Sequence, residues 1–294
     1  MSFFVKPPDR AFMRRVKKFR MKNVLRAYQF LNLISIDVAC GAMVCAAFFA
    51  RIFQIELRPQ GLAALGITVW IIYSIDHLLD ARQLKKEATT KRHLLHQRNF
   101  RALSMLVLAG VMIDLSMILF IRKQVFVWGI GLALIVFLYL LFQRLITPFK
   151  EVMGAILYTG GVWLPVLALH ITPLSASLIF LMIAFALTAL INLVLFSWFD
   201  LEHDRNDTQV SLVTFFGQQN SKRVLSVLFL LQGLLLAGLL VSTPYKTETL
   251  ILVSMNVVLV ILLVAPDWFR KQDIYRLAGD FIFLFPLPYL ILNG

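Results

Sequence analysis

Charged residues are scarce in this sequence of 294 residues, since Asp, Glu, Lys and Arg together make up only 15% of it. Hydrophobic residues account for 60%, whereas an ordinary soluble domain has about 45–50% apolar and about 25% charged residues. A soluble globular fold is excluded because so few polar side chains could not cover its surface. Two cysteines are too few for a disulfide-rich secreted scaffold, and 25 phenylalanines exclude disorder. What remains is a membrane protein that crosses the bilayer several times.

Nine apolar runs are long enough to cross a bilayer as helices, which takes about 20 mostly apolar residues. The runs are continuously apolar rather than alternating, which favours helices over a β-barrel. The last run is the weakest, because it is short and contains Pro286 and Pro288. We therefore expect an all-α protein with one membrane domain, in which residues 28–294 form a nine-helix bundle after a basic segment, residues 1–27. The predicted spans are Tyr28–Ala50, Gly61–Leu79, Ala102–Ile121, Val125–Gln143, Val152–His170, Ser177–Phe199, Val224–Val241, Thr249–Ala265 and Leu277–Leu292.

The net charge of +13 is explained by membrane topology, and no nucleic-acid partner is expected. With nine spans, 24 of the 29 Lys and Arg residues fall in alternate connections that begin with the N-terminus. The other five lie on the opposite side. Basic residues favour the cytoplasmic side of a membrane. The charges therefore predict an odd number of spans, with the N-terminus in the cytoplasm and the C-terminus outside. We expect a multi-pass protein of the plasma membrane of a bacterium.

Two pairs of aspartates end the second and the sixth predicted spans on the cytoplasmic side. Asp76 and Asp80 form the first pair, and Asp200 and Asp204 form the second. Each pair has i,i+4 spacing, so both carboxylates project from one helix face and repel one another. Removing one charge is therefore expected to relieve repulsion when no metal is bound. Mg²⁺ binds one or two carboxylates, keeps several waters and accepts phosphate oxygens, so the pairs predict a magnesium–diphosphate site.

Both pairs have the same surroundings in the sequence. Arg82 follows the first pair, Arg205 follows the second, and a long connection comes after each. The alternative for one isolated pair is that it only solvates the end of its helix. Two pairs on the same side of the membrane, in the same context, favour a binding site at the cytoplasmic face.

Three stretches of the chain match a known pattern. Residues 73–82 contain Asp76 and Asp80 as the last two acids of the pattern N-D-x-x-D-x-x-x-D, with Ile72-Tyr73 in place of its leading Asn-Asp. Residues 199–205, Phe-Asp-Leu-Glu-His-Asp-Arg, match R-D-I-E-x-D-R in three acids and the final arginine. The loop then reaches Ser211-Leu212 and Gly217 at the matching spacing, although Gln209 and Val210 replace its usual basic residues.

The third stretch is Gln143-Arg144 with Thr147, followed by the glycines at 154, 160 and 161. With these patterns the sequence resembles the UbiA-type intramembrane prenyltransferases, which have nine transmembrane helices and aspartate-rich motifs at the ends of helices two and six. The resemblance covers the whole chain in topology, whereas the residue matches are confined to the three stretches.

The resemblance implies a Mg²⁺-dependent enzyme that transfers a polyprenyl group from a prenyl diphosphate to a lipophilic acceptor. The commonest acceptor in the family is an aromatic quinone precursor. The expected catalytic and metal-binding residues are Asp76, Asp80, Asp200 and Asp204. The basic residues expected to contact the diphosphate are Arg82, Arg144, Lys150 and Arg205.

Two alternatives remain open. A terpene cyclase of the same fold is compatible with the replacement at Ile72-Tyr73. A proton-coupled secondary transporter would use Asp37 and Asp114 as relay groups, because both lie near the middle of predicted spans, where ionisable residues are costly.

Overall fold

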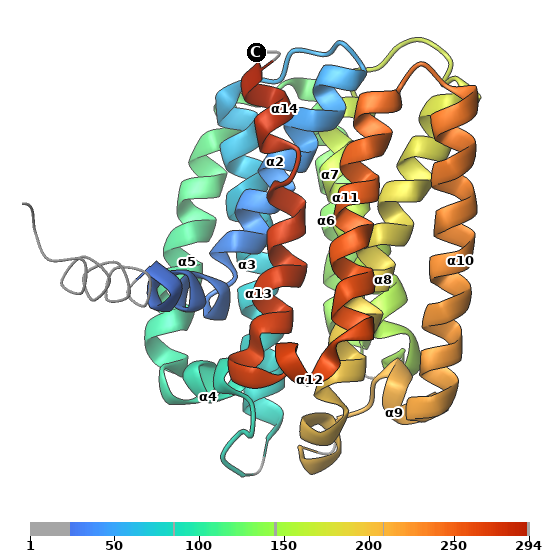
Figure 1. Ribbon diagram of the computed structural model, residues 1–294. Helices are drawn as coiled ribbons and strands as arrows, with labels where there is room; N and C mark the ends of the chain where they lie inside the picture. Colours follow the sequence, from blue (N-terminus) through green and yellow to red (C-terminus); the bar gives the residue numbers. More distant parts are fainter. Residues whose placement is uncertain (1–23, 85, 144–145, 208, 293–294) are drawn as a thin grey trace, which may run out of the picture.

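The computed structural model describes residues 24–84, 86–143, 146–207 and 209–292, and these residues form helices without any strand (Figure 1). Most of the basic N-terminal segment and Arg144 lie outside the described residues. The helices are α2 Ile36–Ile52, α3 Pro59–Gln83, α4 Lys91–Arg98, α5 Phe100–Met117, α6 Lys123–Phe142, α7 Lys150–Leu167, α8 Ala176–Asn206, α9 Leu212–Phe216, α10 Gln218–Ser242, α11 Lys246–Val264, α12 Pro266–Phe269, α13 Ile274–Phe281 and α14 Leu287–Leu292. A further helix, Val24–Leu33, precedes α2.

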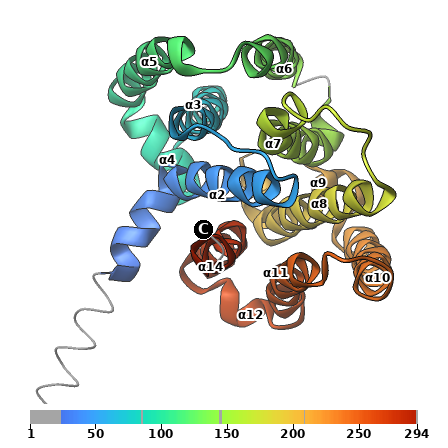
Figure 2. The same ribbon diagram turned by 90° about the horizontal axis from the view of Figure 1, so that it is seen from above.

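The long helices run side by side as one bundle, with the short helices α4, α9 and α12 together at one end (Figure 1). The end of α14 lies at the opposite end of the bundle (Figure 1). Seen from above, α2 and α8 lie toward the interior of the bundle, whereas α5, α6 and α10 lie at its periphery (Figure 2). The exposed faces of α5 and α6 carry large apolar side chains, including Met105, Leu108, Trp128 and Phe137. This outer surface suits contact with lipid.

Seven described helical segments are long and apolar enough to span a membrane, and an eighth is added when the bent segment at the start of the chain counts as one span. The expected polytopic, all-α architecture is therefore confirmed. The remaining predicted span corresponds to α7, which begins with the charged residues Lys150 and Glu151 and contains Pro165. The number nine and the orientation of the termini stay predictions.

The first predicted span, Tyr28–Ala50, is not one continuous helix. The chain bends by 83° between the helix Val24–Leu33 and α2. At the bend Ser35 has a φ of 59°, in the left-handed region, which ends an α-helix because the next backbone groups no longer align. The Trp70 indole N–H donates to the Ile34 carbonyl at 2.9 Å and so satisfies a carbonyl at the break. Apolar composition alone could not reveal this bend.

Close helix packing around α13 positions the polar end of the bundle. A Cβ added at Gly279 would overlap the Asn192 side chain and lie 2.5 Å from the Phe196 ring, both on α8. A Cβ at Gly41 of α2 would lie 2.8 Å from Phe283. The two glycines therefore let the last helical segment approach α2 and α8 closely enough to bring its polar side chains to the centre of the bundle.

Candidate active site

A cavity of about 690 Å³ lies within the bundle and is lined by residues of α3, α5, α6, α7, α8 and α13. This volume is in the range of about 300–1,000 Å³ that small-molecule sites occupy. Its polar lining comes mostly from the end of the bundle that carries α4 and α9, and the rest of the wall is largely apolar. The charged and imidazole side chains of that end are Asp76, His77, Asp80, Arg92, His93, Lys150, Glu151, Asp200, Asp204, Arg276 and Asp280.

Both predicted aspartate pairs line this one cavity, from the last turns of α3 and of α8. Lys150, the first residue of α7, also lines it and interacts electrostatically with Asp80, Asp204 and Asp76. Its ammonium therefore acts on members of both pairs. The helix ends thus place four carboxylates and one cation around the same space, as the sequence pattern predicted.

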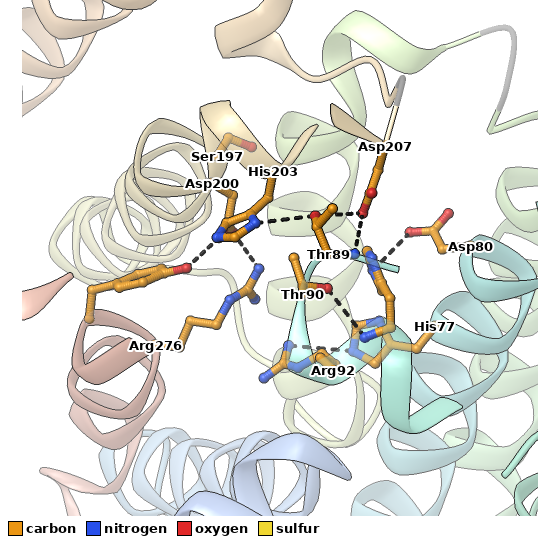
Figure 3. A network of polar contacts seen from close by, with 12 residues as sticks. His77, Asp80, Thr89, Thr90, Arg92, Ser197, Asp200, His203, Asp207 and Arg276 are labelled. Atoms are coloured by element: carbon orange, nitrogen blue, oxygen red, sulfur yellow. Dashed lines mark hydrogen bonds and ion pairs between the residues drawn. The ribbon is translucent and has the colours of Figure 1, made fainter. Parts of the chain in front are cut away.

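Asp200 differs from the other three aspartates because its carboxylate has two strong partners on α13. The Tyr275 hydroxyl donates to one oxygen, and the Arg276 guanidinium forms an ion pair with the other (Figure 3). Asp200 is almost fully buried, and the Arg276 side chain is 21% exposed. Arg276 also lies over the Phe196 ring, 5.4 Å from its centroid. The second motif is therefore tied to the last helical segment by a largely buried ion pair.

The loop after α8 is anchored by Glu151, which follows Lys150 on α7. Its buried carboxylate accepts a hydrogen bond from the Ser197 hydroxyl. It also accepts from the backbone N–H of Leu212 at 3.3 Å. Ser211 caps α9 through a reciprocal hydrogen-bond pair with Thr214, which satisfies free N–H groups at the start of that short helix. The match at Ser211-Leu212 therefore marks the point where the loop is fixed against α7.

Helix α4 brings a second arginine, Arg92, to the cavity, and this one is buried. Arg92 donates to the backbone carbonyl and to the side-chain oxygen of Asn32, at 3.0 and 3.1 Å. The Asn32 amide in turn donates to Asp37 at 2.6 Å and to Asp280 at 2.7 Å. Arg92 also lies 3.8 Å from the Asp280 carboxylate. This network joins α4, the bend before α2 and α13 at the polar end of the cavity.

Two histidines accompany Arg92. Its guanidinium lies 3.4 Å from His77 Nε2 (Figure 3). Burial, together with the positive charges of Arg276 and Arg92, lowers the pKa of His93 to about 3. His93 is therefore neutral at pH 7, so its 3.9 Å approach to Asp80 is a contact between a neutral imidazole and a carboxylate rather than an ion pair. The positive charge at this end comes from Arg92, Arg276 and Lys150.

The loops that follow the two aspartate pairs contact each other directly. The Thr89 hydroxyl donates to Asp207 at 3.1 Å and lies 3.2 Å from His203 Nδ1 (Figure 3). At the start of α4, Lys91 forms an ion pair with Asp273 at 2.8 Å. These contacts connect the loops at the polar end of the bundle to one another and to the segment before α13.

The predicted basic residues have different positions. Lys150 lines the cavity, whereas Arg82 and Arg205 are exposed and lie outside its described lining. Arg144 lies outside the described residues. The sequence reasoning missed Arg92 and Arg276, which belong to no aspartate motif. Arg276 directly precedes the last predicted span, as many basic residues flank spans, and Arg92 lies in a polar connection, so neither position stands out in the sequence.

The two acids proposed for a proton relay lie in different surroundings. Asp37 is buried in the hydrogen-bond network of Asn32 and is not part of the described cavity lining. Asp114 lines the cavity and accepts a hydrogen bond from Thr68 at 2.7 Å. The pair therefore does not form one continuous polar path among the described residues.

Comparison with solved structures identifies the fold. A UbiA homologue from Aeropyrum pernix K1 matches with a TM-score of 0.63 and 14% identity, over 89% of this chain and 97% of that one. A UbiA homologue from Archaeoglobus fulgidus bound to DMAPP and Mg²⁺ matches with a TM-score of 0.59 and 16% identity, over 90% and 99%. A digeranylgeranylglyceryl phosphate synthase matches with a TM-score of 0.52 and 15% identity, over 91% and 97%.

No protein-family profile matches the chain. No curated protein sequence matches it either. The likeness therefore rests on structure, and the resemblance to UbiA-type proteins is confirmed at the level of the fold.

Proposed function

We propose that this UbiA-fold chain is a Mg²⁺-dependent intramembrane prenyltransferase that moves a polyprenyl group from a prenyl diphosphate to a lipophilic acceptor. The observation that carries the proposal is the shared cavity: both aspartate pairs line its polar end, and a long apolar wall continues from them. A prenyl diphosphate has the same division into a highly charged head and a hydrocarbon tail. One of the fold's relatives, from Archaeoglobus fulgidus, is bound to DMAPP and Mg²⁺.

The carboxylates of this chain fit a hard divalent cation. Within the described residues no three His, Cys, Asp or Glu side chains form a compact metal cage. Mg²⁺ does not need one, because it commonly takes one or two carboxylates, several waters and the phosphate oxygens of a substrate. Asp76, Asp80 and Asp204 would supply these carboxylates. Asp200 is a fourth candidate ligand, whose carboxylate is shared with Tyr275 and Arg276.

Bound Mg²⁺ would stabilise the negative charge that develops on the leaving diphosphate, as a Lewis acid does. The protein's own cations act in the same direction. Lys150 is placed between the two pairs, and Arg276 and Arg92 line the same end of the cavity. Fixed positive charges in a site shielded from water stabilise developing charge more strongly than they would in water. The apolar wall would keep water away from the allylic carbon, so that the acceptor captures the prenyl group.

The acceptor is proposed to be lipophilic because most of the cavity wall is apolar. Among lipophilic acceptors we propose an aromatic quinone precursor, because it is the commonest acceptor in the family that the sequence resembles. The cavity itself supports the chemistry of the donor: Tyr73, Tyr139 and Tyr158 line it, and aromatic faces stabilise nearby cations through their π electrons. The same rings would stabilise an allylic cation while the acceptor approaches.

The test uses the purified full-length chain in lipid with Mg²⁺, radiolabelled prenyl diphosphates and a membrane lipid extract. The expected result is a labelled, acceptor-linked product that disappears when Mg²⁺ is chelated. Asp80→Asn keeps the side-chain size but removes a charge, and should lower the rate by at least about 100-fold, because metal stabilisation of a leaving group contributes several kcal/mol. Asp267→Asn is the matched control, since Asp267 is exposed on α12 and lies outside the described cavity lining.

The same experiment separates the alternatives. A labelled hydrocarbon formed without any acceptor would indicate a terpene cyclase instead of a transferase. Labelled substrate that crosses a vesicle membrane without covalent change would indicate a transporter. In that case Asp37→Asn should abolish function while Asp80→Asn stays active.

A further inference from the structure

The apolar part of the cavity is long. Along α3 its lining begins with Asp76 and Asp80 and continues to Gly61. Asp76 and Gly61 are separated by 15 residues in sequence, which corresponds to about 22 Å of helix at 1.5 Å per residue. The cavity therefore extends from the carboxylates across most of a hydrocarbon layer that is about 30 Å thick.

Two glycines leave empty space along this wall. Gly161 of α7 and Gly129 of α6 both line the cavity, and a Cβ added at either position would meet no described atom within 4 Å. Gly161 comes 11 residues after Lys150 and Gly129 comes 14 residues before Gln143. At 1.5 Å per residue they lie about 16 Å and about 21 Å along their helices from the polar end. They mark two successive depths of the same space.

At the deeper of these levels, two residues of the cavity lining are also exposed on the described surface. Leu115 of α5 and Ile130 of α6 line the cavity, yet they are 53% and 54% exposed. Ile130 is the residue after Gly129. In Figure 2 both helices lie at the periphery of the bundle. A hydrocarbon chain longer than the cavity would have to leave it beside these exposed residues.

We propose that this apolar wall binds the tail of a prenyl donor with at least about four isoprenoid units, and that Gly161 and Gly129 determine which donor lengths fit. The inference rests on the proposed prenyltransferase function. Each isoprenoid unit adds four carbon–carbon bonds of about 1.5 Å, so an extended unit advances by about 5 Å. A tail whose diphosphate lies at the aspartates passes Gly161 with its third to fourth unit and Gly129 with its fourth to fifth.

The experiment measures donor preference in mixtures of geranyl, geranylgeranyl and hexaprenyl diphosphates, which have two, four and six units. The wild-type chain should prefer the two longer donors. Gly161→Leu should lower the ratio of four-unit to two-unit transfer by at least about tenfold, because a leucine side chain overfills the space needed by the tail. Gly129→Leu should lower the ratio of six-unit to two-unit transfer by a similar factor.

Gly131→Leu is the matched control. Gly131 lies two residues from Gly129 on α6, its Cβ position is equally free of described atoms, and it is exposed and outside the described cavity lining. Its donor preference should equal that of the wild type. Retained two-unit transfer in all variants shows that the catalytic end is intact and the chain is folded.

Four results would overturn the inference. One is an equal loss of transfer for all donor lengths in Gly161→Leu, and another is the same shift in Gly131→Leu. A third is a changed acceptor preference with unchanged donor preference, which would assign the wall to the acceptor's tail. These three leave the prenyltransferase function standing. If the wild-type chain transfers no prenyl group of any length, the proposed function fails and this inference fails with it.

Discussion

The ion pair between Asp200 and Arg276 predicts that Asp200→Asn destabilises the protein even when no metal is present. Repulsion within the aspartate pairs, considered from sequence alone, leads to the opposite expectation, because removing one charge would relieve it. The structure reverses this for Asp200, whose carboxylate is almost fully buried against Arg276 and Tyr275. Removing one partner of a buried ion pair costs about 3–5 kcal/mol, because the other charge stays buried without compensation.

The expected cost is below that range. The Arg276 side chain is 21% exposed and lines the cavity, so water can solvate part of its charge. We therefore expect a loss of about 2–3 kcal/mol. In a large domain each kcal/mol shifts the melting temperature by about 2–4 °C, so the decrease should be about 4–12 °C.

The assay is thermal unfolding of the purified protein in detergent with a metal chelator present. Asp76→Asn is the matched control, because Asp76 also lines the cavity but faces its like-charged neighbour Asp80, and its melting temperature should stay within about 2 °C of the wild type. Combining Asp200→Asn with Arg276→Gln should recover part of the loss, since contacting residues show coupling energies of about 0.5–3 kcal/mol. Equal melting temperatures for Asp200→Asn and Asp76→Asn would refute the reasoning.

Three further predictions concern the packing of the polar end. Gly279→Ala should lower stability by about 1–3 kcal/mol, because its Cβ would overlap side chains of α8. The control is Gly238→Ala, whose added Cβ would meet no described atom within 4 Å, and it should raise stability by up to about 1 kcal/mol. If thermal unfolding ranks the two variants in the reverse order, α13 does not pack against α8 as closely as described. Asn32→Ala should lower stability by at least about 2 kcal/mol in the same assay, because two buried carboxylates lose their shared donor. An unchanged melting temperature would show that this network does not stabilise the fold. Thr89→Val should leave global unfolding within about 1 kcal/mol, because the contact is exposed, but should speed amide exchange in the loops it joins; exchange at the wild-type rate would show that this contact does not hold them.

Part of the candidate site could be predicted because it follows local spacing. An i,i+4 pair at the end of an apolar run places two carboxylates on one helix face whatever the rest of the chain does. Lys150 could be found in the same way, by its position at the start of a predicted span. Arg92 and Arg276 could not, because no local pattern indicates which of the 29 basic residues will turn into the bundle. Arg82 and Arg205, although adjacent to the motifs, are exposed.

The bend at Ser35 could not be predicted from the sequence either. Hydropathy measures how apolar a run is. The bend is instead accompanied by two long-range hydrogen bonds: Asn32 donates to Asp280, and Trp70 donates to the Ile34 carbonyl at the break. Such bonds replace the regular helix hydrogen bonds only when the rest of the bundle is in place.

The composition, the length of the apolar runs and the spacing of the aspartates by themselves determined that this protein is a helical membrane bundle with carboxylates at one end. The physical reason is that a lipid environment requires long apolar helices, and a carboxylate pair at such depth is costly without a cation. Tertiary structure alone decided that both pairs face one cavity, that Asp200 is bound to Arg276, and that Gly161 and Gly129 line an empty apolar wall. These features depend on which helix faces meet, and helix contacts are fixed by close packing of side chains from distant parts of the chain.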